Sequence, residues 1–179
     1  AMAFVMGLIA ASCSQDEIIS SKDQTGGGTV SIAVNIPVND PVTRVAPTIP
    51  DGYKLRCILQ LVKSSDNSDI TDGRYVQEVA AGSEKVTFTF NAPSDAYKCL
   101  FWADYVKGTV ADVATDADNI YNTADLKAIS YTANAGSEMF KGDVADAFYA
   151  CSLEPVTGNG SLASITMKRP FTKITFKDG

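Results

Sequence analysis

The sequence predicts an all-β protein, an antiparallel β-sandwich with aligned or Greek-key connections. Short runs alternate between apolar and polar residues, which is the pattern of half-buried strands. Breaks rich in glycine, proline, asparagine and aspartate separate these runs at regular spacing. Little of the chain has the spacing of an amphipathic helix. These observations favour two packed sheets in a single domain over residues 29–179.

The clearest strand covers residues 29–38, TVSIAVNIPV. Its alternation places polar or small side chains on one face and apolar side chains on the other, the apolar ones being Val30, Ile32, Val34, Ile36 and Val38. Because proline cannot donate a hydrogen bond to a neighbouring strand, Pro37 indicates that the far end lies at a sheet edge. Residues 39–52, which contain three prolines, follow as an exposed connection.

The next runs predict four further strands. Residues 53–62, YKLRCILQLV, alternate like a strand, and residues 74–79 are the expected partner across a turn-rich stretch. The following strand is marked by Val86, Phe88 and Phe90. Residues 97–106, YKCLFWADYV, carry aromatic and apolar side chains on both faces, so we expect a central strand that is covered on each side.

The C-terminal half is less regular. Residues 107–138 predict a long irregular insertion over the surface, with a short helix near residues 123–129. Residues 143–150 lead to a hairpin whose turn is Gly158 to Gly160, because glycine and asparagine tolerate positive φ. Residues 162–167 return as its second strand.

The first residues predict an export signal with lipid attachment. The apolar run in residues 1–11 is too short for a membrane-spanning helix, which needs about 20 residues, and it fits the apolar part of a secretory signal. Cys13 follows small residues as in a bacterial lipobox, where the thiol takes a diacylglycerol. Residues 15–17 look like the acidic tag that sends lipoproteins of the Bacteroides group to the cell surface. The alternative is an ordinary secretory signal or a buried apolar segment with an incidental cysteine.

The chain thus divides into a signal remnant with lipobox in residues 1–13, a flexible tether in residues 14–28 and one domain in residues 29–179. No basic segment precedes the apolar run, and the last strand-like run stops without a turn. We therefore expect the chain to be truncated at both ends.

Composition excludes several classes of function. A net charge of −6, a pI near 4.6 and the lack of a basic patch argue against a nucleic-acid partner, and leave membrane attachment to the lipid. The chain has no histidine, so it cannot hold a Ser-His-Asp or Cys-His catalytic set, and we expect no enzyme. Residues 66–69 and 116–119 lack the spacing of a calcium loop. We expect neither a metal nor a cofactor.

Cysteine and tryptophan residues fit a buried role. Besides Cys13 there are three cysteines with no CxxC pair, Cys57, Cys99 and Cys151. We expect small buried thiols, with one disulfide as the alternative. Trp102 lies within an apolar run, so we expect it in the core rather than on a sugar-binding surface.

Three stretches together resemble the fimbrillin-like family, the lipoprotein pilins (type V pilins) of Bacteroides-group bacteria. They are CLFWADYV at residues 99–106, DLKAISYTANAGSEMFKGDVADAFYA at residues 125–150 and MKRPFTKITF at residues 167–176. The resemblance implies a transthyretin-like β-sandwich with Greek-key topology, and the chain looks like the first of two such domains. It also implies an outer-membrane lipoprotein at the cell surface that takes part in cell adhesion.

The resemblance further implies a route of assembly. In polymerising members a trypsin-like protease cuts after an arginine behind the first strand, which matches the Arg44–Val45 bond of this chain. The first strand then leaves, and a strand of another subunit takes its place. Its working residues would be Val30, Ile32, Val34 and Ile36. We expect a structural or anchor subunit of a fimbria, whose partners are other fimbrial subunits, the outer membrane and a host or bacterial surface ligand.

Three alternatives stay open. In the first, Arg44 is a solvated loop arginine in a protein that remains anchored, as a pilus base or a stand-alone surface lipoprotein. A surface glycan-binding lipoprotein for nutrient capture would need an exposed aromatic platform, made by Trp102 or by several of Tyr75, Tyr121 and Tyr131. A glycosidase would need two facing carboxylates in a cleft.

Overall fold

The computed structural model describes residues 28–37, 48–107, 120–132, 135–137, 143–152, 154–157 and 163–170. These residues are all-β and contain no α-helix. Their strands are β1 (Thr29–Asn35), β2 (Tyr53–Lys63), β3 (Asp69–Val79), β4 (Lys85–Asn91), β5 (Tyr97–Lys107), β6 (Tyr121–Asn122), β7 (Ser130–Tyr131), β8 (Ala147–Cys151) and β9 (Ile165–Thr166).

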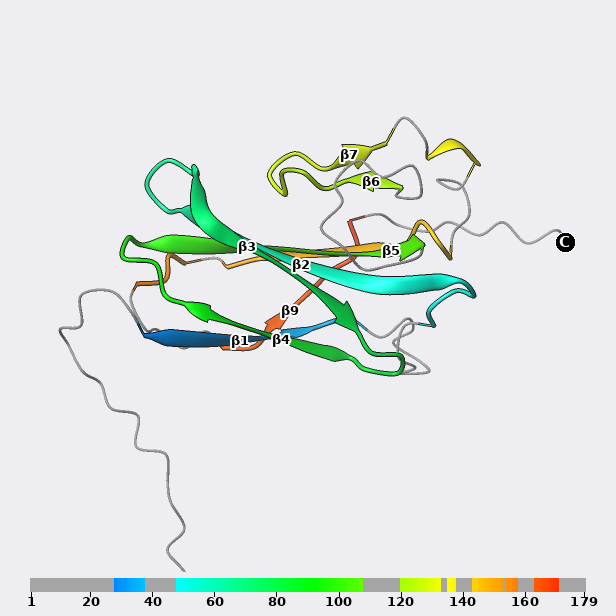
Figure 1. Cartoon of the computed structure of the whole chain (residues 1–179), viewed down its shortest axis with the longest axis horizontal. Helices are drawn as coiled ribbons and strands as arrows, with labels where there is room; N and C mark the ends of the chain where they lie inside the picture. The colour runs from blue at the N-terminus through cyan, green and yellow to red at the C-terminus, as the bar shows by residue number, and fades with distance from the viewer. Residues whose placement is uncertain are drawn as a thin grey trace, which may run out of the picture.

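The strands form two main sheets that lie over one another as in a β-sandwich (Figure 1). One sheet has the order β4-β1-β9 and the other has the order β3-β2-β5-β8. The main core lies between them and is built from inward side chains of both sheets. Every pair in these sheets is antiparallel except β1 with β9, which is parallel.

The prediction of a central strand covered on both sides is confirmed for β5. It pairs with β2 along its whole length and with β8 on its other edge. Phe101 faces the main core, whereas Trp102 faces a second apolar cluster beneath β6 and β7. Figure 1 shows β6 and β7 as a small outer layer on the face of the sheet that points away from β1. The predicted pairing of the 53–62 strand with residues 74–79 is also confirmed.

The helix expected near residues 123–129 is wrong, because local side-chain hydrogen bonds hold turns there instead. The Ala124 amide donates to Asn122 Oδ1 over 3.1 Å, and the Lys127 amide donates to Asp125 Oδ1 over 2.9 Å. Asparagine and aspartate that bind a backbone amide two residues ahead compete with helix formation. The segment therefore joins β6 to β7 as a turn.

A polar network fastens this turn to the sheet below. Gln60 of β2 is 4% exposed and accepts hydrogen bonds from the Leu126 amide (2.9 Å) and Arg74 Nη1 (3.1 Å). Its side-chain amide donates to Asp69 Oδ1 over 2.8 Å and to Asp125 Oδ1 over 3.2 Å. The outer layer is thus held by apolar contacts and by a buried amide whose polar atoms all have partners.

The expected hairpin between residues 143–150 and 162–167 is also wrong. β9 crosses to the other sheet and pairs with β1, with Val34 opposite Ile165 and Asn35 opposite Thr166. Only at Lys168 does the chain return to β8, through an isolated bridge to Tyr149. The predicted turn at Gly158 to Gly160 lies outside the described residues. Alternation shows which face of a strand is buried, but it does not identify the neighbouring strand.

The end of β1 differs from expectation as well. Asn35 pairs with β9, and the Ile36 amide donates to the Glu84 carbonyl over 2.8 Å, so this end has neighbours on both sides. Pro37 lies just beyond these bonds and therefore costs the sheet no donor. Among the described residues, the first part of β1, Thr29–Ala33, pairs with β4 alone.

Candidate functional site

The residues expected to act in assembly fall into two groups. Val30, Ile32 and Val34 lie in β1, and Ile36 follows it. Cys13, Arg44 and Val45 lie outside the described residues, as do residues 1–27 and 38–47 generally. The geometry of the candidate site is therefore that of β1 and of the strands around it.

The apolar face of β1 is completely built into the main core. The three apolar side chains of β1 and that of Ile36 directly after it have exposed fractions between 0% and 2% and pack with residues of both sheets. Full burial of such a side chain contributes about 1.5–3 kcal/mol, so the four contribute about 6–12 kcal/mol. This is comparable with the whole net stability of a typical domain, about 5–15 kcal/mol. If β1 leaves, another apolar strand must fill its place.

The backbone of β1 imposes the same requirement. Its seven residues each have a partner in β4, from Thr29 opposite Asn91 to Asn35 opposite Lys85. The ladder extends at both ends, where the Ala92 amide donates to the Gly28 carbonyl over 2.8 Å and the Met167 amide donates to the Asn35 carbonyl over 2.9 Å. Only an extended backbone in the same register satisfies these groups.

The opposite face of β1 is polar. Thr29 and Ser31 are exposed, and the Ser31 hydroxyl lies 3.0 Å from the hydroxyl of Thr89 on β4. A replacement strand thus needs apolar side chains at alternate positions on one face and tolerates polar residues on the other.

A buried ion pair crosses the central sheet. Arg56 of β2 and Asp104 of β5 are directly opposite, both 0% exposed, and form two parallel bonds, Nε to Oδ1 (2.9 Å) and Nη2 to Oδ2 (2.8 Å). Burial raises the pKa of the Asp104 carboxyl, and the charge and hydrogen bonds of Arg56 oppose that shift. The two bonds join β2 to β5 across the centre of the sheet, which is a structural role. Sequence reasoning missed it, although each residue is a charge within an apolar run.

The expectation of buried thiols is confirmed for Cys57 and Cys99 and is wrong for Cys151, which is exposed. All three are free cysteines. Burial raises the pKa of Cys99 to about 12 and also raises the pKa of Cys57. Because the reactive form of cysteine is the thiolate, the two buried residues are inert packing groups.

The four rings named for the glycan-binding alternative, Trp102, Tyr75, Tyr121 and Tyr131, do not form an open platform together. Trp102 is 5% exposed, as expected for a core residue, and Tyr121 is 2% exposed against it. Tyr75 packs on the main core and stacks on Phe90. Tyr131 alone of the four named rings is exposed, and one of its faces stacks on Tyr121.

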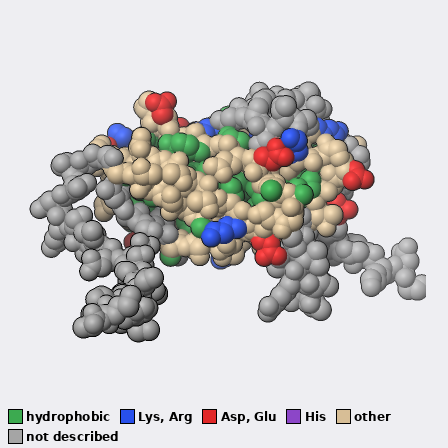
Figure 2. Space-filling view, turned by 60° about the horizontal axis from the view of Figure 1, so that its bottom comes forward, with side chains coloured by type: hydrophobic (Ala, Val, Ile, Leu, Met, Phe, Trp, Pro, Cys, Tyr) green, Lys and Arg blue, Asp and Glu red, His purple; other side chains and the backbone are tan. Residues whose placement is uncertain are grey.

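Charged side chains of both signs are interspersed on the described surface that Figure 2 shows. Within the part of the chain that the structure describes, no three histidine, cysteine, aspartate or glutamate side chains gather to hold a metal ion. In the same residues no helix has the length and apolar character needed to cross a membrane.

Comparison of the sequence with known proteins assigns the chain to a family. No curated protein and no solved structure matches it. Residues 22–178 match a family described as a family of unknown function (DUF6562). Since this match extends over most of the sequence, the chain belongs to the DUF6562 family.

Proposed function

We propose that this protein is a lipid-anchored structural or anchor subunit of a bacterial surface fimbria, assembled by exchange of its first strand. The observation that carries the proposal is the position of β1. It is the first strand of the described residues and lies between β4 and β9. It contributes three buried side chains to the core, and Ile36 directly after it contributes a fourth. Its removal would open a groove between β4 and β9 that only another strand can fill.

The connection after β1 supplies the release step. Arg44 lies in the connection between Pro37, which follows β1, and residue 48. A cut after Arg44 would leave β1 attached to the domain by noncovalent contacts alone. The departing piece would carry the proposed lipid on Cys13, so a single cut would release the anchor and make β1 exchangeable.

The fold proposed for this role is a transthyretin-like sandwich with Greek-key connections. Support comes from the crossing of β9 to the sheet of β1, which separates consecutive strands between two layers. Adhesion at the outer cell surface would follow from the polymer, and the subunit itself would need no catalytic group.

The proposal is tested on native protein purified from cells with and without an inhibitor of trypsin-like proteases. Mass spectrometry of the N-terminal peptide should show a chain that begins at Val45 without inhibitor and a lipidated Cys13 with inhibitor. A lipidated Cys13 that stays joined to residues 14–44 under both conditions would refute release by proteolysis. A protein without lipid under both conditions would refute the anchor.

A further inference from the structure

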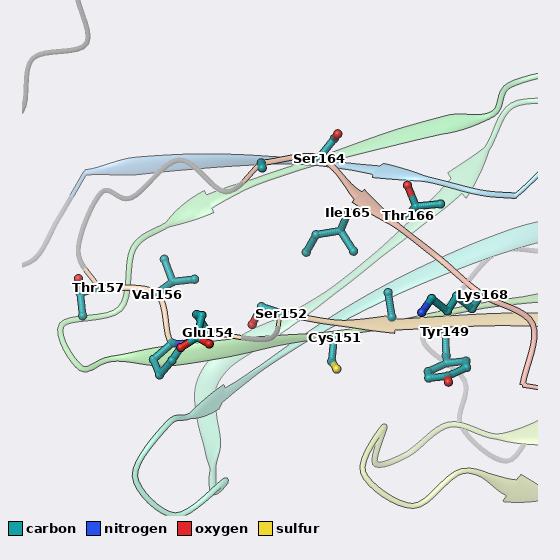
Figure 3. A pocket seen from close by; sticks show the side chains of 13 residues that line it. Tyr149, Cys151, Ser152, Glu154, Val156, Thr157, Ser164, Ile165, Thr166 and Lys168 are labelled. Atoms are coloured by element: carbon teal, nitrogen blue, oxygen red, sulfur yellow. The ribbon is translucent and has the colours of Figure 1, made fainter.

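A groove separates β8 from β9 on one side of the sandwich. It has a volume of about 720 Å³, with residues 149–152 and 154–157 along one wall and residues 163–166 and Lys168 along the other. Figure 3 shows the two walls diverging from the point where Lys168 meets Tyr149. At that point each backbone amide donates to the carbonyl of the other residue over 2.8 Å. Beyond it, the two strands enter different sheets and the groove widens between them.

Both walls present backbone groups of sheet edges to this groove. The Ser152 amide donates to the Cys99 carbonyl over 2.9 Å, so alternate residues of β8 face β5 and Cys151 faces away from it. On the other wall the Met167 amide binds β1 through Asn35, so Thr166 faces away from β1. Beyond the Tyr149–Lys168 bridge, neither edge has a further strand beside it among the described residues. Such an edge is a template for one class of ligand, an extended polypeptide.

β8 is the last strand of one sheet and β9 is the last strand of the other, so the two walls are sheet edges on the same side of the sandwich. An extended strand that enters the groove can add to either edge. It would close the open side of the sandwich beyond the Tyr149–Lys168 bridge.

The side chains in the groove specify the composition of such a strand. Val156 and Ile165 point into it from opposite walls (Figure 3), and both pack against the main core. Val156 is already buried, and small apolar side chains on the inward face of the ligand would cover the half-buried Ile165. Glu154 and Lys168 lie toward opposite ends of the groove (Figure 3), so a basic residue fits at one end and an acidic residue at the other.

We propose that this groove binds an extended peptide strand of another protein, with alternating small apolar residues, a basic residue beside Glu154 and an acidic residue beside Lys168. The site uses β8 and β9 and leaves β1 in place. It goes beyond the proposed function, because it would operate in the uncut chain whether or not β1 is exchanged.

The test is fluorescence anisotropy of the full uncut chain with a labelled synthetic peptide of alternating valine and threonine that carries lysine at one end and aspartate at the other. Cys151→Pro removes an amide that points away from β5, so β8 keeps its ladder while the groove loses a donor. Cys151→Ala is the matched control. We expect Cys151→Pro to raise the Kd about tenfold, while Cys151→Ala binds like the unchanged protein.

Charge exchange gives a second readout. Glu154→Lys should weaken binding of the lysine-ended peptide and strengthen binding of a peptide in which that lysine is glutamate. Circular dichroism of each variant verifies that the fold is kept. The proposal is overturned by the absence of binding at millimolar peptide, by equal binding to Cys151→Pro and Cys151→Ala, or by peptide preferences that Glu154→Lys leaves unchanged. Because the chain is uncut, these outcomes leave the exchange of β1 untouched.

Discussion

Truncation of Ile32 to alanine tests whether β1 is an integral part of the core. Ile32 is 0% exposed and packs in the cluster shared by both sheets. Replacing a fully buried isoleucine with alanine costs about 2–5 kcal/mol, since it removes apolar contacts and leaves a cavity. The neighbouring Ser31 is exposed and loses only a surface hydroxyl contact on change to alanine, so Ser31→Ala should cost less than about 0.5 kcal/mol.

Urea unfolding followed by tryptophan fluorescence measures both variants, because the single Trp102 is buried in the central sheet. With a dependence of about 1–3 kcal/mol per molar urea, Ile32→Ala should lower the midpoint by about 1 M or more, and Ser31→Ala should barely move it. Equal midpoints for the two variants would refute the assignment of β1 to the core. They would also remove the reason for a replacement strand.

Three further predictions concern the layers around the central sheet. Arg56→Met should lower the free energy of unfolding in urea by about 3–5 kcal/mol, because it leaves the Asp104 carboxylate buried without its partner. A second change, Asp104→Leu, should restore most of that loss. A double variant no more stable than the single one would contradict this. Gln60→Leu should speed hydrogen exchange of the Leu126 amide and lower the free energy of unfolding by about 1–3 kcal/mol, because this amide loses its acceptor, Gln60 Oε1. Unchanged exchange of the Leu126 amide would contradict the role of Gln60 in holding the turn. The hydrogen bond from Lys127 lowers the pKa of Asp69 in the folded protein. The ion pair therefore stabilises the protein fully above the pKa of aspartate in the unfolded chain, about 4. This stabilisation disappears as the pH falls through the lowered pKa of the folded protein. The difference in urea midpoint between the unchanged protein and Lys127→Met should accordingly shrink on acidification from pH 5, and a difference independent of pH would exclude the pair as its cause.

Alternation in the sequence was sufficient to assign the buried faces. The apolar face of residues 29–36, the strand at residues 53–62 and the covered position of Trp102 all follow from side-chain order along one strand. Such order reflects local geometry, because successive side chains of a strand point to opposite faces. The four residues proposed for exchange therefore follow from the sequence pattern alone and do not depend on which strands are neighbours of β1.

The same pattern could not predict which strands are neighbours in the sheets. β9 is a strand of two residues, and nothing in its composition indicates that it joins β1 rather than β8. The turns at residues 122–128 depend on side-chain oxygens that accept backbone amides, which outweighed a weak helical pattern. The Arg56–Asp104 pair required knowledge of the register between β2 and β5, since the two charges are distant in sequence. The structure thus differed from the prediction mainly in which distant residues pair, and less in which residues are buried.

The central claim is that β1 can be replaced by another strand once the chain is cut behind it. The most direct measurement uses the full chain cut after Arg44 by a trypsin-like protease, with the cut verified by mass. Cut and uncut protein are each incubated with an isotope-labelled peptide of residues 28–37, and native mass spectrometry then reports which strand is bound. The account predicts that the cut protein takes up the labelled strand and loses its own, that the uncut protein does not, and that a peptide carrying Ile32→Asp fails to enter. Cut protein that keeps its own strand and excludes the labelled peptide, or that takes up the Ile32→Asp peptide equally well, would contradict it.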